Sequence, residues 1–330
     1  MSTWAWGGND EGGLGDGTLT PSSSPVLVLG EHIFTSGDAS RWFAVALDSS
    51  NHAWAWGSGN DGKLGNNSTT DVSSPVSVTG DHAFIQISCG DSHTVAKDSA
   101  NHGWAWGNNY HGQLGFYNNY YKSNPYSIYG GHVFSVITAG DFHTLAIDNN
   151  GHGWAWGSVE YYKLGVYGCY NNKPQSIVGG HIFIEISGGT NHSVAIDSSN
   201  HAWAWGKNAS GQLGNNSTTE KSTPVSVVGD HEFVKISAGH DHTLAIDSSG
   251  HGWAWGENFA GQLGDNTTVD KSVPVSIVGG HVFTTINAGY DYSVGVDDSN
   301  LAWAWGLNDL GQLGNNTTIS QSTPVSVIGF

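Results

Sequence analysis

The sequence has few charged residues, and basic residues are the scarcest of them. Only 12% of its 330 residues are charged, and 10 Lys and Arg stand against 28 Asp and Glu, for a formal net charge of −18. Nucleic acid and anionic membrane surfaces bind proteins that present basic patches. The charge balance therefore predicts that neither is a partner of this chain.

Cysteines and long apolar runs are also scarce. The two cysteines, Cys89 and Cys169, occupy unlike places in the repeat described below, so we expect no disulfide between them. No apolar run approaches the ~20 residues of a membrane span, which predicts no membrane insertion. The opening residues, MSTWAWGGND, have neither the basic nor the apolar region of a signal peptide.

Tryptophan, by contrast, is abundant and periodic. The string WAWG occurs seven times at intervals of 49 or 50 residues, and it holds 14 of the 15 tryptophans. A strict period of this length is typical of a repeat architecture in which each unit packs on its neighbours. We expect one domain over residues 1–330, with repeats that open at Trp4, Trp54, Trp104, Trp154, Trp203, Trp253 and Trp303.

Each repeat reads as four short strands. In the unit of residues 229–279 the runs EFVKISAG (232–239), HTLAID (242–247), GWAWG (252–256) and PVSIVG (274–279) alternate or are β-branched, and turn residues separate them. No window has helical periodicity. The pattern predicts an all-β fold, a β-propeller of ~50-residue blades with four strands each. The two Trp of WAWG then lie on one face of a strand and pack between blades.

The motifs resemble the regulator of chromosome condensation repeat. GQLG at residues 112–115, 211–214, 261–264 and 311–314, HTLAID before the Trp strand and PVSV after it all match that family. The resemblance covers almost the whole chain and implies a seven-bladed propeller. The near-identity of the repeats also resembles arrays in bacterial and phage surface proteins.

Members of the resembled family do different work. One kind is a nucleotide-exchange factor for a small GTPase on chromatin, another is the plant ultraviolet-B photoreceptor, and a third is a secreted inhibitor of β-lactamases. The photoreceptor carries Trp-Arg before the HT pair. Here those positions read Asp91-Ser92, Asp141-Phe142, Thr190-Asn191, His240-Asp241 and Tyr290-Asp291, so light sensing is not implied.

The strand count leaves one blade incomplete. There are seven WAWG strands but only six copies of the strand pair that precedes one, and these open at His32, His82, His132, His181, His231 and His281. We favour seven Trp-bearing blades, of which one lacks its two inner strands. The alternatives are six blades with an extra N-terminal hairpin, or inner strands supplied by another chain.

Histidine is frequent, yet it predicts no metal site. Of 17 His, 15 occur at three fixed repeat positions, so neighbouring ligands would lie one blade apart, whereas a metal needs ligands at ~2 Å. We expect these side chains to make turn and cross-strand hydrogen bonds. Because no nucleophile motif, phosphate loop or carboxylate pair appears, we expect no enzyme activity, catalytic residue or cofactor.

The repeat symmetry breaks in two neighbouring loops that are rich in tyrosine. Ten of the 12 Tyr lie between residues 110 and 170, where other repeats carry GNNSTT or GDNTTV. Tyrosine offers a large contact face and a polar tip, which suits recognition of protein or sugar. The candidate contact residues are Tyr110, Phe116, Tyr117, Tyr120, Tyr121, Tyr161, Tyr162, Tyr167 and Tyr170.

Several loops also contain the Asn-x-Ser/Thr pattern of glycosylation acceptors. The polar-turn interpretation is favoured over modification. The sites are Asn67, Asn208, Asn216, Asn266 and Asn316.

Together these observations predict a non-enzymatic binding or structural propeller that recognises a protein or a glycan through its loops. The abundance of uncharged polar residues favours display outside a cell or on a virion, with the cytoplasm as the alternative. Two further functions stay open. One is self-assembly into a multimer or filament through the incomplete blade, and the other is a nucleotide-exchange or inhibitor role like those of the resembled family.

Overall fold

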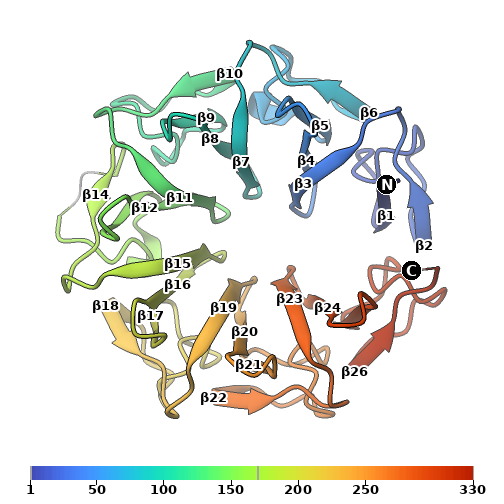
Figure 1. Cartoon of the computed structure of the whole chain (residues 1–330), viewed down its shortest axis with the longest axis vertical. Coiled ribbons are helices and arrows are strands. Elements are labelled where there is room, and N and C mark those ends of the chain that lie inside the picture. Colours follow the sequence, from blue (N-terminus) through green and yellow to red (C-terminus); the bar gives the residue numbers. More distant parts are fainter. Residues whose placement is uncertain (1, 169–170, 330) are drawn as a thin grey trace. The chain divides into compact units, whose positions relative to one another are not determined.

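The computed structural model describes residues 2–168 and 171–329, and its regular structure is almost entirely antiparallel β-sheet (Figure 1). The chain divides into two compact units. The first comprises Met1–Pro21, Val26–Val159 and Tyr167–Ile177, and the second comprises Ser22–Pro25, Glu160–Val166 and Val178–Phe330.

Three four-stranded sheets form most of the first unit, each from strands consecutive in the chain. Two short 3-10 helices follow WAWG strands, η1 (Asn60–Gly62) in this unit and η2 (Glu160–Tyr162) in the second. The strands of the three sheets are β3 (Phe34–Ala39), β4 (Phe43–Asp48), β5 (Ala53–Gly57) and β6 (Val72–Ser77); β7 (Phe84–Cys89), β8 (His93–Asp98), β9 (Gly103–Gly107) and β10 (Lys122–Ser127); and β11 (Phe134–Ala139), β12 (His143–Asp148), β13 (Gly153–Gly157) and β14 (Gln175–Ser176).

The second unit repeats this plan three times. Its strands are β15 (Phe183–Gly188), β16 (His192–Asp197), β17 (Ala202–Gly206) and β18 (Lys221–Ser226); β19 (Phe233–Ala238), β20 (His242–Asp247), β21 (Gly252–Gly256) and β22 (Lys271–Ser276); and β23 (Phe283–Ala288), β24 (Tyr292–Asp297), β25 (Ala302–Gly306) and β26 (Gln321–Ser326).

The first WAWG string forms a smaller sheet. β1 (Trp4–Gly7) pairs only with β2 (Ser22–Leu27). The predicted all-β propeller class is confirmed, but the count of seven blades is partly wrong. Among the described residues there are six four-stranded blades and one two-stranded sheet, because only six repeats supply the preceding strand pair.

Within a blade, the Trp strand is the third strand and its register is the same in every copy. In the blade of β19–β22, Leu244 lies opposite Ala254 and Ala245 lies opposite Trp253. Because side chains alternate along a strand, both Trp lie on one face and the Ala lies on the other. That Ala is fully buried in all six complete blades, which explains why nothing larger than Ala stands between the two Trp.

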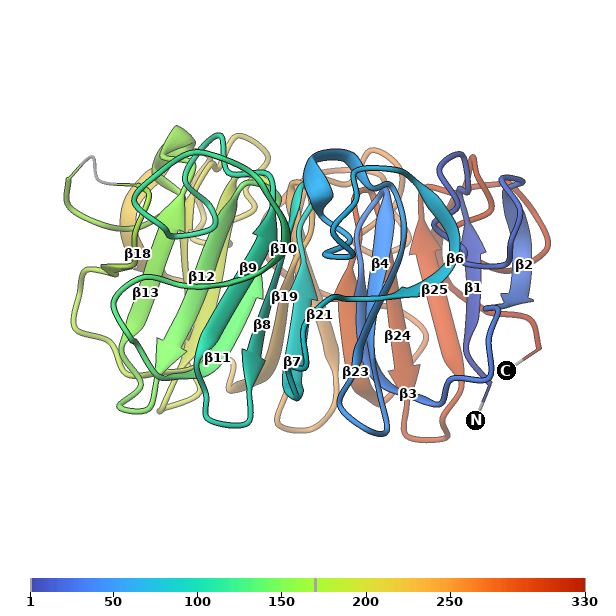
Figure 2. The same cartoon turned by 90° about the horizontal axis from the view of Figure 1, so that it is seen from above.

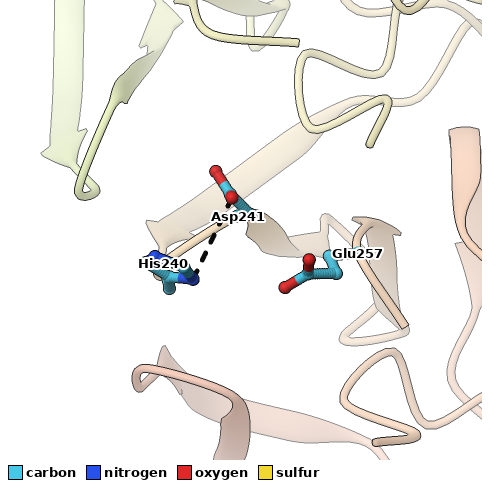
Figure 3. Close-up of side chains that lie close together, drawn as sticks. All are labelled: His240, Asp241 and Glu257. Atoms are coloured by element: carbon cyan, nitrogen blue, oxygen red, sulfur yellow. Dashed lines mark ion pairs between the residues drawn. The ribbon is translucent and has the colours of Figure 1, made fainter. Parts of the chain in front are cut away.

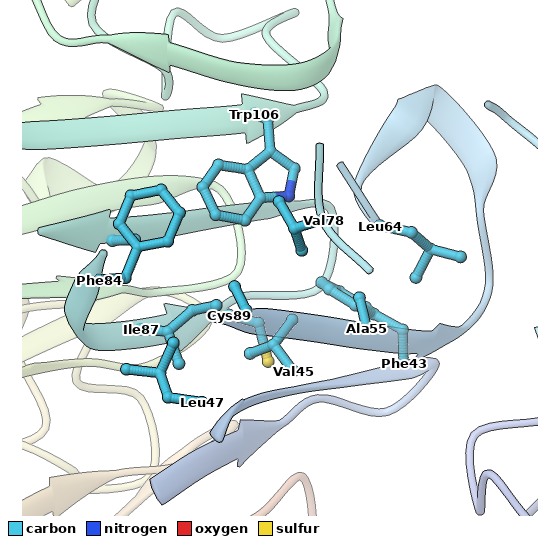
Figure 4. Packing of buried hydrophobic residues seen from close by; sticks show 12 residues of the cluster. Phe43, Val45, Leu47, Ala55, Leu64, Val78, Phe84, Ile87, Cys89 and Trp106 are labelled. Carbon is cyan, nitrogen blue, oxygen red and sulfur yellow. The ribbon is translucent and has the colours of Figure 1, made fainter. Parts of the chain in front are cut away.

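The core lies between neighbouring sheets. Figure 4 shows Phe84 and Ile87 of β7 against Val45 and Leu47 of the preceding sheet, with Trp106 beside them. The interpretation of the Trp strings as core residues is therefore correct for the second Trp of each complete blade. Cys89 belongs to the same cluster, and burial raises the pKa of its thiol well above the ordinary value. Cys169 lies outside the described residues.

A second contact joins each repeat to the next through the long loop after the Trp strand. A Cβ added to Gly62 would lie 2.4 Å from the Cα of Ser123, and the N–H of Asn67 donates to the Ser123 carbonyl at 2.7 Å. In the second unit the loop of the last repeat makes the same pair of contacts with the first repeat. There Gly311 lies against Ser23, and the N–H of Asn316 donates to the Ser23 carbonyl at 2.8 Å.

The up-and-down order of the strands decides which loops share an end of a blade. The turn between the first and second strands lies at the same end as the long loop between the third and fourth. Figure 2 shows η1, which belongs to such a loop, at the upper end of its sheet. None of the helices among residues 2–168 and 171–329 has the length and apolar character that a membrane crossing needs.

Candidate binding surface

In five of the seven long loops one buried asparagine holds the loop in shape, whereas Gly59 and Val159 stand at this place in the other two. In the third repeat, the side-chain oxygen of Asn109 accepts the N–H of Leu114 at 2.9 Å, and its amide donates to the Asn118 carbonyl. Because the same frame recurs, the loops differ chiefly in the side chains that they display. The equivalent buried residues are Asn9, Asn208, Asn258 and Asn308.

In the first unit, the loop framed by Asn109 and the stretch that begins at Tyr167 display tyrosine to solvent. Tyr110, Tyr120 and Tyr167 are 75, 76 and 81% exposed, and Tyr117 and Tyr121 are each about half exposed. Exposed aromatic side chains gathered in this way are typical of contact surfaces. The structure therefore places five of the predicted contact residues at the surface of this unit.

Tyr117 is the best positioned of these side chains. Its ring lies 4.2 Å from the ring of Tyr129 in an edge-to-face arrangement, and the ammonium of Lys173 lies 5.3 Å from its centre. The backbone of Tyr117 has a φ of 62°, where other repeats place Asn. A tyrosine in this left-handed conformation costs free energy that the Asn of the other loops does not.

The remaining predicted contact residues have different surroundings. Phe116 is buried in the core cluster of the third repeat and packs 5.1 Å from Tyr126, so the expectation that it forms part of an exposed contact surface is wrong. Tyr161 and Tyr162 belong to η2 in the second unit and are about half exposed. Tyr170 lies outside the described residues.

Sequence reasoning missed two tyrosines that belong to this surface. Tyr126 and Tyr129 are about half exposed, and the ammonium of Lys122 lies 4.6 Å from the centre of the Tyr126 ring. Val76 and Thr79 hold the same places in the second repeat. The sequence thus shows that these two positions differ between repeats. Tyr126 lies in β10 and Tyr129 lies just after it, outside the loop from which the candidate residues were chosen.

The glycosylation pattern is ruled out at one of its five sites. Asn208 is buried, and its side-chain amide donates to Asn215, Ser217 and Thr219, so it cannot accept a glycan. The other four are exposed and have φ near 60°, which fits the polar-turn interpretation. They are Asn67, Asn216, Asn266 and Asn316.

Three buried histidines connect neighbouring blades. Nε2 of His242 lies 3.0 Å from the hydroxyl of Ser293, and that hydroxyl donates to the Gln262 carbonyl at 2.7 Å. Since the hydroxyl proton is already used, Nε2 must carry the proton and donate, which leaves Nδ1 unprotonated. His93 with Thr144 and His192 with Thr243 repeat the arrangement.

Burial keeps these histidines neutral. It lowers the pKa of His93 and of His242 to about 3 and that of His192 to about 4, because burial disfavours the charged ring and no protein group accepts a hydrogen bond from Nδ1. Each of these rings therefore makes the structural hydrogen bond expected of it.

One histidine outside the three repeat positions lies in an acidic cluster of the second unit. His240, Asp241 and Glu257 have potential ligand atoms within 4.8 Å of one another (Figure 3). Asp241 is already bound by the ammonium of Lys207 and by the amide of Gln212. The ring of His240 stacks on Tyr290 at 4.0 Å, with its Nδ1 3.7 Å from the Asp291 carboxylate.

The charges of this cluster shift the pKa of two of its members. Burial lowers the pKa of His240, but Asp291 and Asp241 outweigh it and hold the pKa above its ordinary value. Burial, together with the same two carboxylates, raises the pKa of Glu257. The cluster is a network of mutually compensating charges, and a bound cation would have to compete with Lys207 for Asp241.

In the first unit, the corresponding turns carry a second unusual carboxyl. Burial and the negative charge of Asp141 raise the pKa of Asp91 to about 7. The turn at this place in the first complete blade reads Arg41-Trp42, with the guanidinium 4.6 Å from the indole centre. Sequence reasoning missed this copy. Its order is the reverse of the Trp-Arg pair that the resemblance associates with the photoreceptor.

Comparison with known proteins identifies the repeat. A family model described as the regulator of chromosome condensation (RCC1) repeat matches residues 50–96, 103–147, 199–246, 249–296 and 299–330. A second model of the same description matches residues 84–113, 183–212 and 233–262. No curated protein sequence matches the chain significantly.

Solved structures share the fold over almost the whole chain. The crystal structure of human WBSCR16 has a TM-score of 0.89 at 19% identity and covers 99% of this chain and 93% of its own. Prp20p from Saccharomyces cerevisiae, described with its binding properties to Gsp1p and histones, has a TM-score of 0.89 at 22% identity, covering 98% and 85%. Yeast RCC1 (Prp20) bound to Kap60 has a TM-score of 0.88 at 22% identity, covering 98% and 83%.

These comparisons correct one prediction. The expected location outside a cell or on a virion is wrong, because the proteins that share the fold over the whole chain are intracellular, and one of them binds histones and Gsp1p. The polar, weakly charged composition that suggested display is a property of the loops in this repeat, and it does not specify a compartment.

Proposed function

Because the chain belongs to the regulator of chromosome condensation (RCC1) repeat family, we propose that it is a non-enzymatic protein-binding propeller. Its partner contacts the tyrosines that the third repeat displays. The observation that carries the proposal is the exposure of Tyr110, Tyr117, Tyr120 and Tyr121 on a loop frame whose other copies, at Asn9, Asn208, Asn258 and Asn308, carry no tyrosine.

The physical reason is the large contact area that a tyrosine supplies at a small entropic cost. Its two side-chain torsions lose little freedom on binding, and truncation of a central interface tyrosine typically costs ~2 kcal/mol or more. The Tyr117–Tyr129 contact and the Lys173 ammonium hold one ring in place before any partner arrives. A preorganised aromatic anchor of this kind favours affinity.

The charge of the chain narrows the choice of partner. A net charge of −18 repels acidic proteins and attracts basic ones to the chain as a whole. The described partners of Prp20p include histones, which are basic, and this supports a protein with a basic surface as the partner. A glycan bound by the same tyrosines is the competing ligand.

A loop exchange tests the proposal. Residues 117–121 (YNNYY) are replaced by the equivalent NSTTE of residues 216–220, while the buried Phe116 is kept. Tyr117 and Asn216 share a left-handed φ, so the backbone accepts the change. The matched control replaces residues 216–220 by NTTIS from residues 316–320, an exchange of the same length in a loop without tyrosine.

The measurement compares binding to immobilised wild-type and variant proteins, using histone and small-GTPase panels and a glycan array. We expect the tyrosine exchange to weaken binding to a protein of these panels at least tenfold and the control exchange to leave it unchanged. Equal binding by all three proteins would refute the tyrosine surface. If the tyrosine exchange weakens binding to a glycan and to no protein of the panels, the ligand is a sugar and not a protein.

A second candidate function is nucleotide exchange on a small GTPase. It is favoured by the whole-chain fold similarity to Prp20p, whose structure is described with its binding to Gsp1p. An exchange assay with a labelled guanine nucleotide decides it. Release from a GTPase that accelerates with propeller concentration supports this function, and a release rate that does not change with propeller concentration rejects it.

A further inference from the structure

The cluster around His240 is built from the ends of neighbouring strands in the second unit. His240 and Asp241 form the turn between β19 and β20, and Glu257 follows β21 directly (Figure 3). Asp291 lies in the turn between β23 and β24. The N–H of Glu257 donates to the Asp241 carbonyl at 2.9 Å, and the N–H of His240 lies 3.3 Å from the carbonyl oxygen of Tyr290. Backbone hydrogen bonds therefore hold the segments that carry these side chains in fixed positions.

The chemistry of the cluster is peculiar to this part of the chain, although the repeats are close copies of one another. Of the six turns between a first and a second strand, only this one has a histidine at its first place, and Asp stands at the second place only in Asp241 and Asp291. Glu257 is the one acidic residue directly after a WAWG string. The other six residues at that place are Gly8, Ser58, Asn108, Ser158, Lys207 and Leu307.

One of these differences reverses a charge. In the preceding repeat, the residue after the string is Lys207, and its ammonium forms an ion pair with the Asp241 carboxylate. Glu257 and Asp291 hold the equivalent places one repeat later, so a carboxylate stands where the preceding repeat supplies the cation. Burial, together with the negative charges of Asp241 and Asp291, raises the pKa of Glu257. A cation bound at this place would relieve that repulsion.

The carboxylate of Asp291 is buried and faces the cluster. The residue is only 8% exposed, and its Oδ1 has no hydrogen-bond partner among the described residues. In the preceding repeat, Gln212 donates to Asp241 at 2.7 Å, whereas the equivalent amide nitrogen of the fully buried Gln262 is without a partner in the described part of the chain. The Asp291 Oδ1 instead lies 3.7 Å from Nδ1 of His240, which is equally without a hydrogen bond there. An acceptor buried in this way costs free energy unless a donor or a cation meets it.

The spacing of the ligand atoms is close to that of a metal site. Nδ1 of His240 lies 3.7 Å from Asp291 and 4.0 Å from Asp241, and ligand atoms of His240, Asp241 and Glu257 lie within 4.8 Å of one another. Nitrogen and oxygen ligands at ~2.1 Å from a tetrahedral ion lie ~3.4 Å apart. The two contacts of His240 would therefore shorten by less than about 1 Å around an ion.

We propose that this cluster binds one divalent transition-metal ion of the zinc class. Its ligands are Nδ1 of His240 and the carboxylates of Asp241, Glu257 and Asp291. The imidazole nitrogen favours such an ion over Ca²⁺ and Mg²⁺, which prefer oxygen ligands alone. The expected absence of a metal site concerned the histidines at the three repeat positions, and His240 stands at none of them.

Lys207 is a competitor within the site. Its ammonium and the metal ion share the Asp241 carboxylate, so the ion binds only as the ammonium withdraws. The Lys207 side chain is 24% exposed, so water is available to the ammonium that leaves. The site does not depend on the tyrosines of the proposed function, which belong to other repeats.

Isothermal titration calorimetry of the full chain with Zn²⁺, after removal of metals with a chelator, tests the proposal. Two variants take the residue that the preceding repeat has at the same place. They are His240→Thr, as in Thr190, and Glu257→Lys, as in Lys207. Because the same fold accepts both residues one repeat earlier, the variants are expected to fold. Visible absorption of the Co²⁺-substituted protein reports whether the ion has protein ligands.

Two further variants serve as the matched control and as the test of the competitor. His251→Leu, as in Leu301, removes an exposed histidine that lies 3.7 Å from the Asp247 carboxylate, so it measures Zn²⁺ binding at an ordinary surface His–Asp pair. Lys207→Met removes the ammonium and retains a side chain of similar length.

The wild type and His251→Leu are expected to bind one Zn²⁺ with the same affinity. Binding is expected to be at least tenfold weaker in His240→Thr and Glu257→Lys, and at least threefold tighter in Lys207→Met. Without metal, Glu257→Lys is expected to melt no lower than the wild type, because it restores the Lys–Asp pair of the preceding repeat. The tyrosine-loop exchange is expected to bind Zn²⁺ normally, so failure of either proposal is told apart from failure of the other.

Three results would overturn the proposal. One is the absence of a Zn²⁺ site with a stoichiometry of one, and another is equal affinity of the wild type and His240→Thr. The third is tighter binding of Ca²⁺ or Mg²⁺ than of Zn²⁺. An unchanged affinity in Lys207→Met would overturn the assignment of Asp241 as a ligand.

Discussion

Lowering the pH from about 7.5 to about 5 is expected to destabilise the protein through three buried histidines, His93, His192 and His242. In the folded protein their pKa values are about 3, about 4 and about 3, whereas an unfolded chain has a histidine pKa near 6.5. Below pH 6.5 the unfolded state therefore takes up protons that the folded state refuses. Stability falls as the pH drops through 6.5, and the loss stops only below the folded pKa.

The size of the effect follows from linkage. At about pH 5 one such histidine lowers the free energy of unfolding by about 2 kcal/mol relative to neutral pH, because 1.5 pH units separate this pH from the unfolded pKa. Asp91 acts in the opposite direction, since burial beside Asp141 raises its pKa to about 7. The pH dependence of the free energy of unfolding of the whole protein therefore contains contributions of both signs. The contribution of one histidine is obtained by comparing the wild type with a variant that lacks it.

His242→Phe is the variant that makes this separation. Phenylalanine is the residue that the first complete blade carries at this position, as Phe43, and the Ser293 hydroxyl keeps its bond to the Gln262 carbonyl. Urea denaturation at both pH values measures the free energy of unfolding. The wild type is expected to lose about 2 kcal/mol more than the variant on acidification. Parallel losses in the two proteins would refute a neutral, strongly buried His242.

Two further predictions concern the turns that fix the tryptophans. Asp247→Asn is expected to lower the free energy of unfolding by ~1–3 kcal/mol in urea denaturation. One carboxylate oxygen accepts the indole N–H of Trp253 at 2.9 Å and the other accepts the backbone N–H of His251, and the amide of Asn would put a donor in place of one of these acceptors. An unchanged denaturation midpoint would contradict this. Gly264→Ala is expected to lower the melting temperature more than Gly280→Ala. Both glycines have φ near +68°, but only the added methyl at Gly264 would meet Trp305, at 2.8 Å, and equal shifts would argue against that close contact.

The sequence was sufficient to predict the blade because the information for it is local and repeated. Alternation at Leu244 and Ile246, the turn Asp247 and the paired Trp253 and Trp255 occur at fixed offsets, and six near-identical copies average out the ambiguity of any single one. The incomplete blade was also countable, since each strand type has its own motif. Among the described residues, the structure has six four-stranded blades, and a two-stranded sheet stands where we favoured a seventh, incomplete blade.

The contact surface was only partly predictable, because the sequence of a loop does not tell which of its side chains are exposed to solvent. Phe116 and Tyr117 are neighbours in sequence, but the side chain of Phe116 is buried and that of Tyr117 is exposed. The backbone of Tyr117 has a left-handed φ, so the two side chains point in different directions. Tyr129 joins the surface from beyond the following strand, a contact that no motif records. The cluster at His240 escaped notice for a similar reason, since Glu257 comes from the end of another strand.

The contact between Asn316 and Ser23 has a consequence for the order of folding. The same contact elsewhere, such as that of Asn67 with Ser123, spans 56 residues, whereas this one spans 293. By the logarithmic dependence of loop closure on length, its initial formation costs about 1.5 kcal/mol more in chain entropy than the others. The two backbone hydrogen bonds, 2.7 Å for Asn67 and 2.8 Å for Asn316, both join an Asn N–H to a Ser carbonyl, so the bond at Asn316 does not offset this cost. This junction is thus expected to form last and to open first. In native-state hydrogen exchange, the Asn316 amide is expected to exchange faster than the equivalent amides of the other repeats, such as that of Asn67.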